Sequence, residues 1–153
     1  MRVIVSGIVN NNGKVLLGRK HKDRKPYANC WHLLGGGVRD FERAKELIDN
    51  KDWDNDYFHD ELKRELTEEG NIVVNNIRSI IPKYQDKPAE DTTFNKFGEE
   101  THYIFLVYLC DYVSGNVKAS DDIAEVRWIK KDKLKSLRLT PPSVVLFNEL
   151  GWM

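Results

Sequence analysis

The alternation of apolar and polar residues predicts a protein built around a β-sheet. Runs rich in Val, Ile and aromatic residues, bounded by Asn, Gly, Pro or Ser, are typical of strands. Such runs stand at residues 2–9, 14–19, 31–34, 102–113 and 123–129, with weaker ones at 72–74 and 78–84. The run at 102–113 is almost continuously apolar, so we expect it in the middle of the sheet. Asn12-Gly13 favours a hairpin turn between the first two strands.

Apolar residues at helical spacing predict one amphipathic helix over about residues 57–70. Its apolar side is formed by Tyr57, Phe58, Leu62 and Leu66. Either Asn55 or Asp56 is expected to cap its start. A short helical turn is expected at 41–48, a charged one at 131–137, and a closing helix after Pro141, because Pro is favoured at the first helical position. Residues 85–100 are polar and contain Pro and Gly, and we interpret them as a long loop.

Composition and charge narrow the class of protein. The chain has 153 residues, which favours a single domain over 1–153. Its formal net charge is zero, so binding to nucleic acid or to an anionic membrane is not indicated. No apolar run approaches the roughly 18 residues of a spanning helix, and we read no signal peptide, so the cytoplasm is the expected location. Cys30 and Cys110 do not make a disulfide framework.

Glutamates gather on one face of the predicted helix. They stand at Glu61, Glu65, Glu68 and Glu69. Residues three and four apart are neighbours on a helix, and like charges there repel by about 0.2–0.5 kcal/mol per pair. A divalent cation would turn this repulsion into attraction, since Mg²⁺ prefers oxygen ligands. The alternative is a solvated acidic face, relieved by Lys63 and Arg64.

The sequence around these glutamates resembles the Nudix box. Gly36 is followed by five residues and Glu42, and the pattern resumes at Arg64 with Arg-Glu-Leu-Thr-Glu-Glu and Ile72. The Nudix pattern places seven residues between the Glu and the Arg, whereas this chain has 21, which indicates an insertion at about 43–59 that must bulge outward. Asn71 stands where the family has Gly, and Asn tolerates the left-handed conformation that ends a helix; Gly70 could also carry that turn.

The resemblance implies an α/β fold, the α/β/α sandwich of Nudix proteins with its mixed sheet. It also implies Mg²⁺, with Mn²⁺ as the alternative, held by Glu65 and Glu69 with Glu68 in support. The general base is left open between Glu68 and Glu69 on the helix and Glu99, Glu100 or Glu125 outside it. By resemblance Arg64 belongs to the catalytic site and makes a structural salt bridge to Glu42 of the box, which pins the glycine turn. The alternative for Arg64 is a surface pair with Glu61 or Glu68.

Substrate contacts are expected at two places. Gly35-Gly36-Gly37 allow the backbone to approach a ligand, and in the family this turn lies near the diphosphate. The basic stretch at 19–25 is either a solvated loop or the source of a phosphate contact from Arg19 or Arg24. Phe94 and Phe97 either stack on a base or anchor their loop.

The expected activity is Mg²⁺-dependent hydrolysis of a nucleoside diphosphate linked to another group. A nucleoside triphosphate, cleaved to the monophosphate and pyrophosphate, is the first choice of substrate, followed by ADP-ribose or a dinucleoside polyphosphate. A non-catalytic nucleotide-binding module is the second hypothesis, and isomerisation of an isoprenoid diphosphate, which would need Cys30 or Cys110 as an acid/base group, is the third. The expected partner is a small-molecule nucleotide, and a homodimer is left open.

Overall fold

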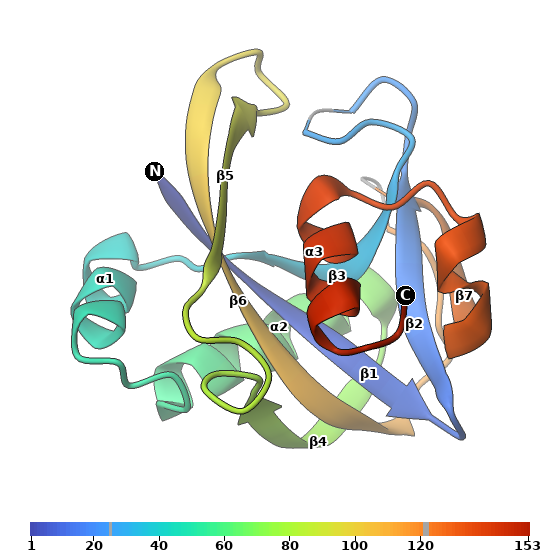
Figure 1. Cartoon of the computed structure of the whole chain (residues 1–153), viewed down its shortest axis with the longest axis horizontal. Helices are drawn as coiled ribbons and strands as arrows, with labels where there is room; N and C mark the ends of the chain where they lie inside the picture. The colour runs from blue at the N-terminus through green and yellow to red at the C-terminus, as the bar shows by residue number, and fades with distance from the viewer. Residues whose placement is uncertain (25, 121–122) are drawn as a thin grey trace.

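A mixed seven-stranded sheet lies at the centre of the protein, with helices on both faces (Figure 1). The computed structural model describes residues 1–24, 26–120 and 123–153. The strands are β1 (Arg2–Asn11), β2 (Lys14–Lys20), β3 (Trp31–Gly37), β4 (Val73–Ser79), β5 (Ala89–Phe94), β6 (Glu100–Ser114) and β7 (Ile123–Lys130). The helices are α1 (Phe41–Asp49), α2 (Asp56–Gly70), the 3₁₀ helix η1 (Lys131–Ser136) and α3 (Pro141–Glu149). The predicted α/β/α sandwich is confirmed.

The N-terminal strand β1 is a central strand of the sheet. The order is β4-β6-β1-β3-β2-β7, with β5 pairing separately with β6. β1 and β6 run parallel from Arg2↔Tyr103 to Asn10↔Asp111, whereas the other pairs are antiparallel. β6 therefore has neighbours on both sides, as its apolar sequence predicts.

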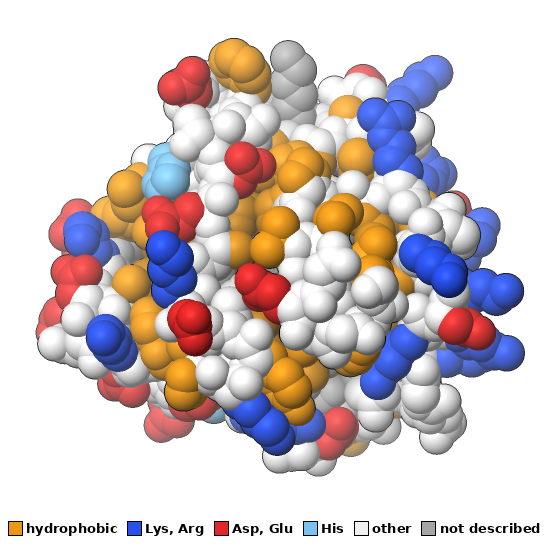
Figure 2. Space-filling model, in the orientation of Figure 1, with side chains coloured by type: hydrophobic (Ala, Val, Ile, Leu, Met, Phe, Trp, Pro, Cys, Tyr) orange, Lys and Arg blue, Asp and Glu red, His pale blue; other side chains and the backbone are white. Residues whose placement is uncertain are grey.

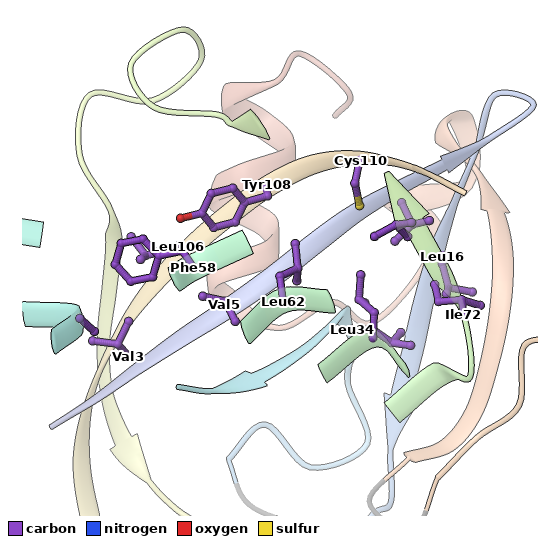
Figure 3. Close-up of a cluster of buried hydrophobic side chains, with 14 of the residues drawn as sticks. Val3, Val5, Leu16, Leu34, Phe58, Leu62, Ile72, Leu106, Tyr108 and Cys110 are labelled. Carbon is purple, nitrogen blue, oxygen red and sulfur yellow. The ribbon is translucent and has the colours of Figure 1, made fainter. Parts of the chain in front are cut away.

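Two hydrophobic cores lie on opposite faces of the sheet. On one face, Phe58, Leu62 and Leu66 of α2 are fully buried against the sheet. Figure 3 shows this core, with Phe58 and Leu62 beside Val5 of β1. On the other face, Leu146 and Phe147 of α3 pack with side chains that include Ile8, Leu17, Leu33, Val107 and Ile129. The helical spacing of apolar residues in α2 thus identifies its buried side correctly.

The inserted segment leaves the body of the protein and returns close to where it left. Asp40 caps α1 by accepting a hydrogen bond from the Arg43 backbone N–H at 3.0 Å, and Asn55 caps α2 by accepting from the Tyr57 N–H at 2.9 Å. The Asp40 N–H donates to the Tyr57 hydroxyl at 2.9 Å, which joins the two ends. The Tyr108 hydroxyl donates to the Trp53 carbonyl at 2.5 Å and fastens the middle to β6. The outward bulge is therefore a closed excursion that contains α1.

Two predictions between residues 72 and 100 are wrong. The strand expected at 78–84 is the end of β4, which stops at Ser79, and Ile80 and Ile81 are buried in a turn rather than in a strand. The loop expected at 85–100 contains β5, which pairs with β6 from Ala89↔Phe105 to Phe94↔Glu100. The polar sequence of β5 concealed it, because alternate side chains of this strand are exposed; backbone pairing and contacts of Glu90 and Thr92 with His102 hold it against β6.

The ends of α2 and the start of α3 agree with the sequence analysis. α2 ends at Asn71, which adopts the left-handed conformation with φ 57° and ψ 40°. Pro141 opens α3 as expected. Trp31 is 7% exposed and belongs to the core on the α3 side. No helix among the described residues is long and apolar enough to cross a membrane.

Candidate active site

Strand β3 brings three consecutive glycines against helix α2. Gly35, Gly36 and Gly37 pair with Ser6, Val5 and Ile4 of β1, so they belong to the strand and not to the loop that we expected. The Gly35 N–H is directed the other way and donates to Glu69 Oε1 at 2.8 Å. This bond ties the free side of β3 to the last turn of α2.

The contact between Gly36 and Glu65 is too close for any side chain at position 36. A Cβ atom built on Gly36 would overlap the Glu65 carboxylate, and one on Gly35 would overlap the Val5 backbone. Glycine is therefore required by the close approach itself. The insertion does not push the glycines away from the acidic helix.

Arg64 holds the acidic face together. Its guanidinium pairs with the Glu61 carboxylate, with Glu65 Oε1 at 2.9 Å and with Glu68 Oε2 at 3.1 Å, and Nη2 lies 3.4 Å from the Gly37 carbonyl oxygen. The predicted salt bridge to Glu42 is not formed, because Glu42 lies exposed in the first turn of α1. Arg64 nevertheless pins the glycines, through the Gly37 carbonyl, and its 19% side-chain exposure separates it from an ordinary surface pair.

The four glutamates differ in their surroundings. Burial raises the pKa of Glu65 above its usual value, although Arg64 opposes the shift. Burial acts in the same direction on Glu61, but hydrogen bonds from Arg64 and Arg39 outweigh it and lower the pKa of that carboxyl. The Glu68 side chain is 62% exposed on the outer side of α2. Glu61 is thus a paired structural acid, whereas Glu65 and Glu69 face the glycines of β3.

A cavity of about 670 Å³ opens beside Glu65 and Glu69 and extends across the sheet towards α3. Its apolar lining includes Ile4, Leu33, Phe105, Val107 and Leu146. Figure 2 shows hydrophobic side chains in a hollow of this face, with acidic side chains close by. The volume falls within the ~300–1,000 Å³ of small-molecule sites. The acidic helix face and an apolar chamber are therefore continuous.

The structure sorts the predicted contact residues. Gly35, Gly36 and Gly37 line the cavity, as do Arg24, Phe97 and the base candidate Glu99. Arg19 is not among the lining residues, because its side chain bonds to Asn29 Oδ1 at 3.0 Å and pairs with Glu125 at 3.5 Å. Lys25, in the same basic stretch, lies outside the described residues.

The remaining candidates for the general base lie away from the cavity, and Phe97 does not anchor its segment. Glu68, Glu100 and Glu125 do not line the cavity. Phe97 is 76% exposed at the tip of the β5–β6 hairpin, so it does not anchor that segment.

Arg2 lines the cavity and was not identified by the sequence analysis. Its guanidinium lies over Gly37, where an added Cβ would overlap it. The register of β1 and β3, Ile4↔Gly37, carries the first strand past the last glycine and so brings Arg2 to this point. No local pattern in the sequence links residue 2 to the glycines, because the link is a strand pairing across more than thirty residues.

The donor set suits a divalent cation. Glu65 and Glu69 present carboxylate oxygens to the cavity beside the β3 backbone, and hard cations such as Mg²⁺ take oxygen ligands. Among the described residues no three acidic, His or Cys side chains already converge as a cation site. In this conformation the Arg64 guanidinium supplies the compensating charge for Glu65 and Glu68.

Neither cysteine can act in this cavity. Cys30 and Cys110 are both buried, and neither is among the lining residues. The Cys110 thiol points to the Ile8 carbonyl at 3.8 Å, and burial raises its pKa to about 12. The acid/base group that an isoprenoid diphosphate isomerase would need is therefore not provided by either residue.

Curated relatives match nearly the whole chain. The nucleoside triphosphatase NudI of Enterobacter sp. (strain 638) is 25% identical over 151 residues, covering 98% of this chain and 96% of its own. The protein of the same name from Escherichia coli O139:H28 is 28% identical over 135 residues, covering 87% and 84%. No family model matches the chain.

Solved structures share the fold. A MutT Nudix hydrolase from Burkholderia pseudomallei superposes with a TM-score of 0.67 at 22% identity, covering 97% of each chain. The Nudix domain of Shewanella oneidensis NrtR, solved with ADP-ribose, gives 0.64 at 14% identity and covers 97% of this chain and 85% of its own. Nudix hydrolases generally use a divalent metal. With the box residues brought together on α2 and β3, this chain resembles NudI nucleoside triphosphatases over most of its length and has the fold of Nudix hydrolases.

Proposed function

We propose that the protein is a Mg²⁺-dependent nucleoside triphosphate pyrophosphohydrolase, releasing the nucleoside monophosphate and pyrophosphate. The observation that carries the proposal is the continuity of Glu65 and Glu69 with an apolar cavity of about 670 Å³. A nucleotide has the same two parts, since its phosphates need cationic partners and its base needs an apolar slot. The names of the NudI relatives support a triphosphate over other nucleotides.

Glu65 and Glu69 are the proposed metal ligands, with Glu68 in support after its carboxylate leaves Arg64. When bound, Mg²⁺ supplies neutralisation of phosphate charge and activation of a water. The Gly35 N–H holds Glu69 at 2.8 Å, and Arg64 holds Glu65 at 2.9 Å, so both carboxylates are oriented before substrate arrives. Such preorganisation lowers the cost of reaching the transition state.

The proton of the attacking water needs an acceptor within hydrogen-bond reach. Glu69 and Glu99 both line the cavity, and Glu68 stands one turn away on the outer face of α2. Glu69 is the stronger candidate on the helix, because it lines the cavity and is oriented by the Gly35 N–H, whereas Glu68 does not line the cavity. Arg64 is proposed to be a positioning residue, because its guanidinium orients the Glu65 and Glu68 carboxylates.

Arg2 is proposed to bind a substrate phosphate. Among the described residues its guanidinium makes no ion pair, and it lies at the glycine edge of the cavity. A guanidinium presents several N–H donors in one plane and suits phosphate oxygens. Arg24, also at the cavity, is the candidate from the basic stretch. The absence of a side chain at Gly37 leaves room for the Arg2 guanidinium, which a Cβ atom at position 37 would displace.

The test is a panel of nucleoside triphosphates, ADP-ribose and dinucleoside polyphosphates, each incubated with Mg²⁺ or Mn²⁺ and with products identified by chromatography. We expect monophosphate and pyrophosphate from triphosphates, and loss of turnover when the metal is chelated. Release of single phosphate groups, or cleavage of ADP-ribose alone, would replace the proposed reaction. Binding of nucleotides without any cleavage would support the binding module, which the ADP-ribose complex of the NrtR domain keeps as the second candidate.

A further inference from the structure

Three buried polar atoms on the cavity walls have no hydrogen-bond partner among the described residues. They are His32 Nε2, Gln85 Oε1 and the Tyr103 hydroxyl oxygen. All three residues line the same cavity. A buried polar group without a partner is destabilising, and such groups in native proteins call for an explanation. Their concentration around one chamber indicates that its occupant provides the missing partners.

Gln85 can present only its oxygen to an occupant. Its amide Nε2 donates to Glu149 Oε2 at 2.8 Å, and a carboxylate accepts but does not donate. Rotating the amide by half a turn would set two acceptor oxygens against each other. Glu149 therefore fixes the orientation of the amide, and Oε1 remains as the unsatisfied acceptor. Gln85 is 7% exposed, so bulk water does not satisfy it.

His32 is an acceptor for the same kind of reason. Its Nδ1 lies 2.6 Å from the Leu33 carbonyl oxygen, which can only accept, so Nδ1 carries the proton. Burial lowers the pKa of His32 to about 4, and the neutral ring then has a bare Nε2. The Tyr103 hydroxyl can donate or accept, so it does not discriminate between donor and acceptor groups of an occupant. Both directional groups on the cavity wall thus require hydrogen-bond donors from an occupant.

We propose that Gln85, oriented by Glu149, is a specificity-determining residue that selects nucleotides whose base carries an exocyclic amino group. The proposal rests on the triphosphate activity inferred above. Cytosine presents an N4 amino donor where uracil presents the O4 acceptor, so the two bases differ at one edge with nearly equal shape. An amino group would donate to Gln85 Oε1, whereas a carbonyl would face it with a second acceptor.

The exposed position of Glu149 makes the proposal testable without disturbing the site. Glu149 lies at the end of α3 and does not line the cavity, so it acts on the base only through Gln85. Glu149→Gln can both donate and accept, which frees the Gln85 amide to turn. Glu149→Lys can only donate, which draws Gln85 Oε1 towards residue 149 and offers Nε2 to the base instead.

The experiment compares kcat/KM for dCTP and dUTP with Mg²⁺ in the full chain. We expect the unmodified protein to prefer dCTP by about tenfold or more, the size of one discriminating hydrogen bond. The ratio should approach one in Glu149→Gln and turn in favour of dUTP in Glu149→Lys. Glu46→Lys makes the same charge change on the exposed face of α1 and should leave the ratio unchanged, and thermal unfolding checks that each variant is folded.

Each outcome decides between the two inferences. Triphosphates could be hydrolysed while the kcat/KM ratio of dCTP to dUTP does not respond to residue 149, or while the unmodified protein prefers dUTP. In either case Gln85 does not select the base, and the proposed triphosphate hydrolysis stands. If no triphosphate is cleaved by any variant, the proposed function fails and the selection fails with it. A ratio that moves equally in Glu46→Lys would trace the effect to overall charge and overturn the role of Gln85.

Discussion

The two faces of the sheet carry the two halves of the site, and they are built in different ways. On the α2 face, Glu65, Glu68 and Glu69 follow each other within about one turn of helix, and Glu65 and Glu69 meet the consecutive glycines of β3. On the α3 face, the cavity is assembled from β1, β3, β6, α3 and the segment around Gln85. The acidic machinery is local in sequence, whereas the chamber for the rest of the substrate is a product of the tertiary fold.

This difference explains which parts could be predicted from the sequence. The box could be found because its residues have fixed spacing on one helix, and the spacing survived an insertion on one side of it. The strand β5 could not be found, because Glu90, Asp91 and Thr92 are polar residues that backbone hydrogen bonds recruit into the sheet. Sequence patterns detect burial, and an edge strand with little burial gives them almost no signal.

The cavity residues were missed for a related reason. Arg2 reaches Gly37 through a strand register, and Gln85 reaches Glu149 across 64 positions of sequence. Neither pairing leaves a local pattern. Arg19, by contrast, was predicted to contact substrate because it stands in a basic stretch, and the fold pairs it with Glu125 instead. Charge in a loop indicates a phosphate contact only when the direction of the side chain is known.

The largest expected effect tests the local half of the site. Glu65→Gln removes a charge that the metal requires while keeping the size of the side chain, so kcat should fall by on the order of 10²–10³. Glu42→Gln, in the same box but exposed on α1, should retain nearly full turnover. Steady-state kinetics with Mg²⁺ measures both, and near-normal turnover of Glu65→Gln would mean that the helix is not the metal site.

A large loss of stability is expected from the core that positions this helix. Leu62 is fully buried on the inner side of α2, so Leu62→Ala should lower the free energy of unfolding by about 2–5 kcal/mol. Val145→Ala, on the 50% exposed side of α3, should change it by no more than about 0.5 kcal/mol. Urea denaturation gives both values, and equal losses would contradict the assignment of inner and outer faces.

A smaller effect is expected where the two halves meet. Arg2→Gln removes the guanidinium at the Gly37 edge, and KM for a triphosphate should rise about tenfold, since a hydrogen bond to a charged group contributes about 1.5–3 kcal/mol. Arg43→Gln, an exposed arginine of α1, is the matched control. A fall in kcat with unchanged KM would instead place Arg2 in the chemical step.

The smallest effect concerns the closure of the insertion. Tyr57→Phe removes the hydroxyl that accepts from the Asp40 N–H, and it should cost about 1 kcal/mol of stability. Turnover should change little, because Arg64 and the Gly35 N–H still hold the carboxylates. Tyr84→Phe, at a 40% exposed side chain, provides the comparison in thermal unfolding. A strong loss of activity in Tyr57→Phe would show that the glycine edge depends on the closure.

The meeting of Asp40 with Tyr57 has a practical consequence for engineering. The segment between them is folded, since Ala44 and Leu47 of α1 are buried in the core on the α2 side, and its exposed turn is the part where length can change at small cost. A fluorophore or a short tag placed in the exposed turn at 50–52 would therefore project into solvent, and the position of α2 would not change. The number of residues in this exposed turn can therefore vary, provided that α1 keeps its packing and Asp40 still meets Tyr57.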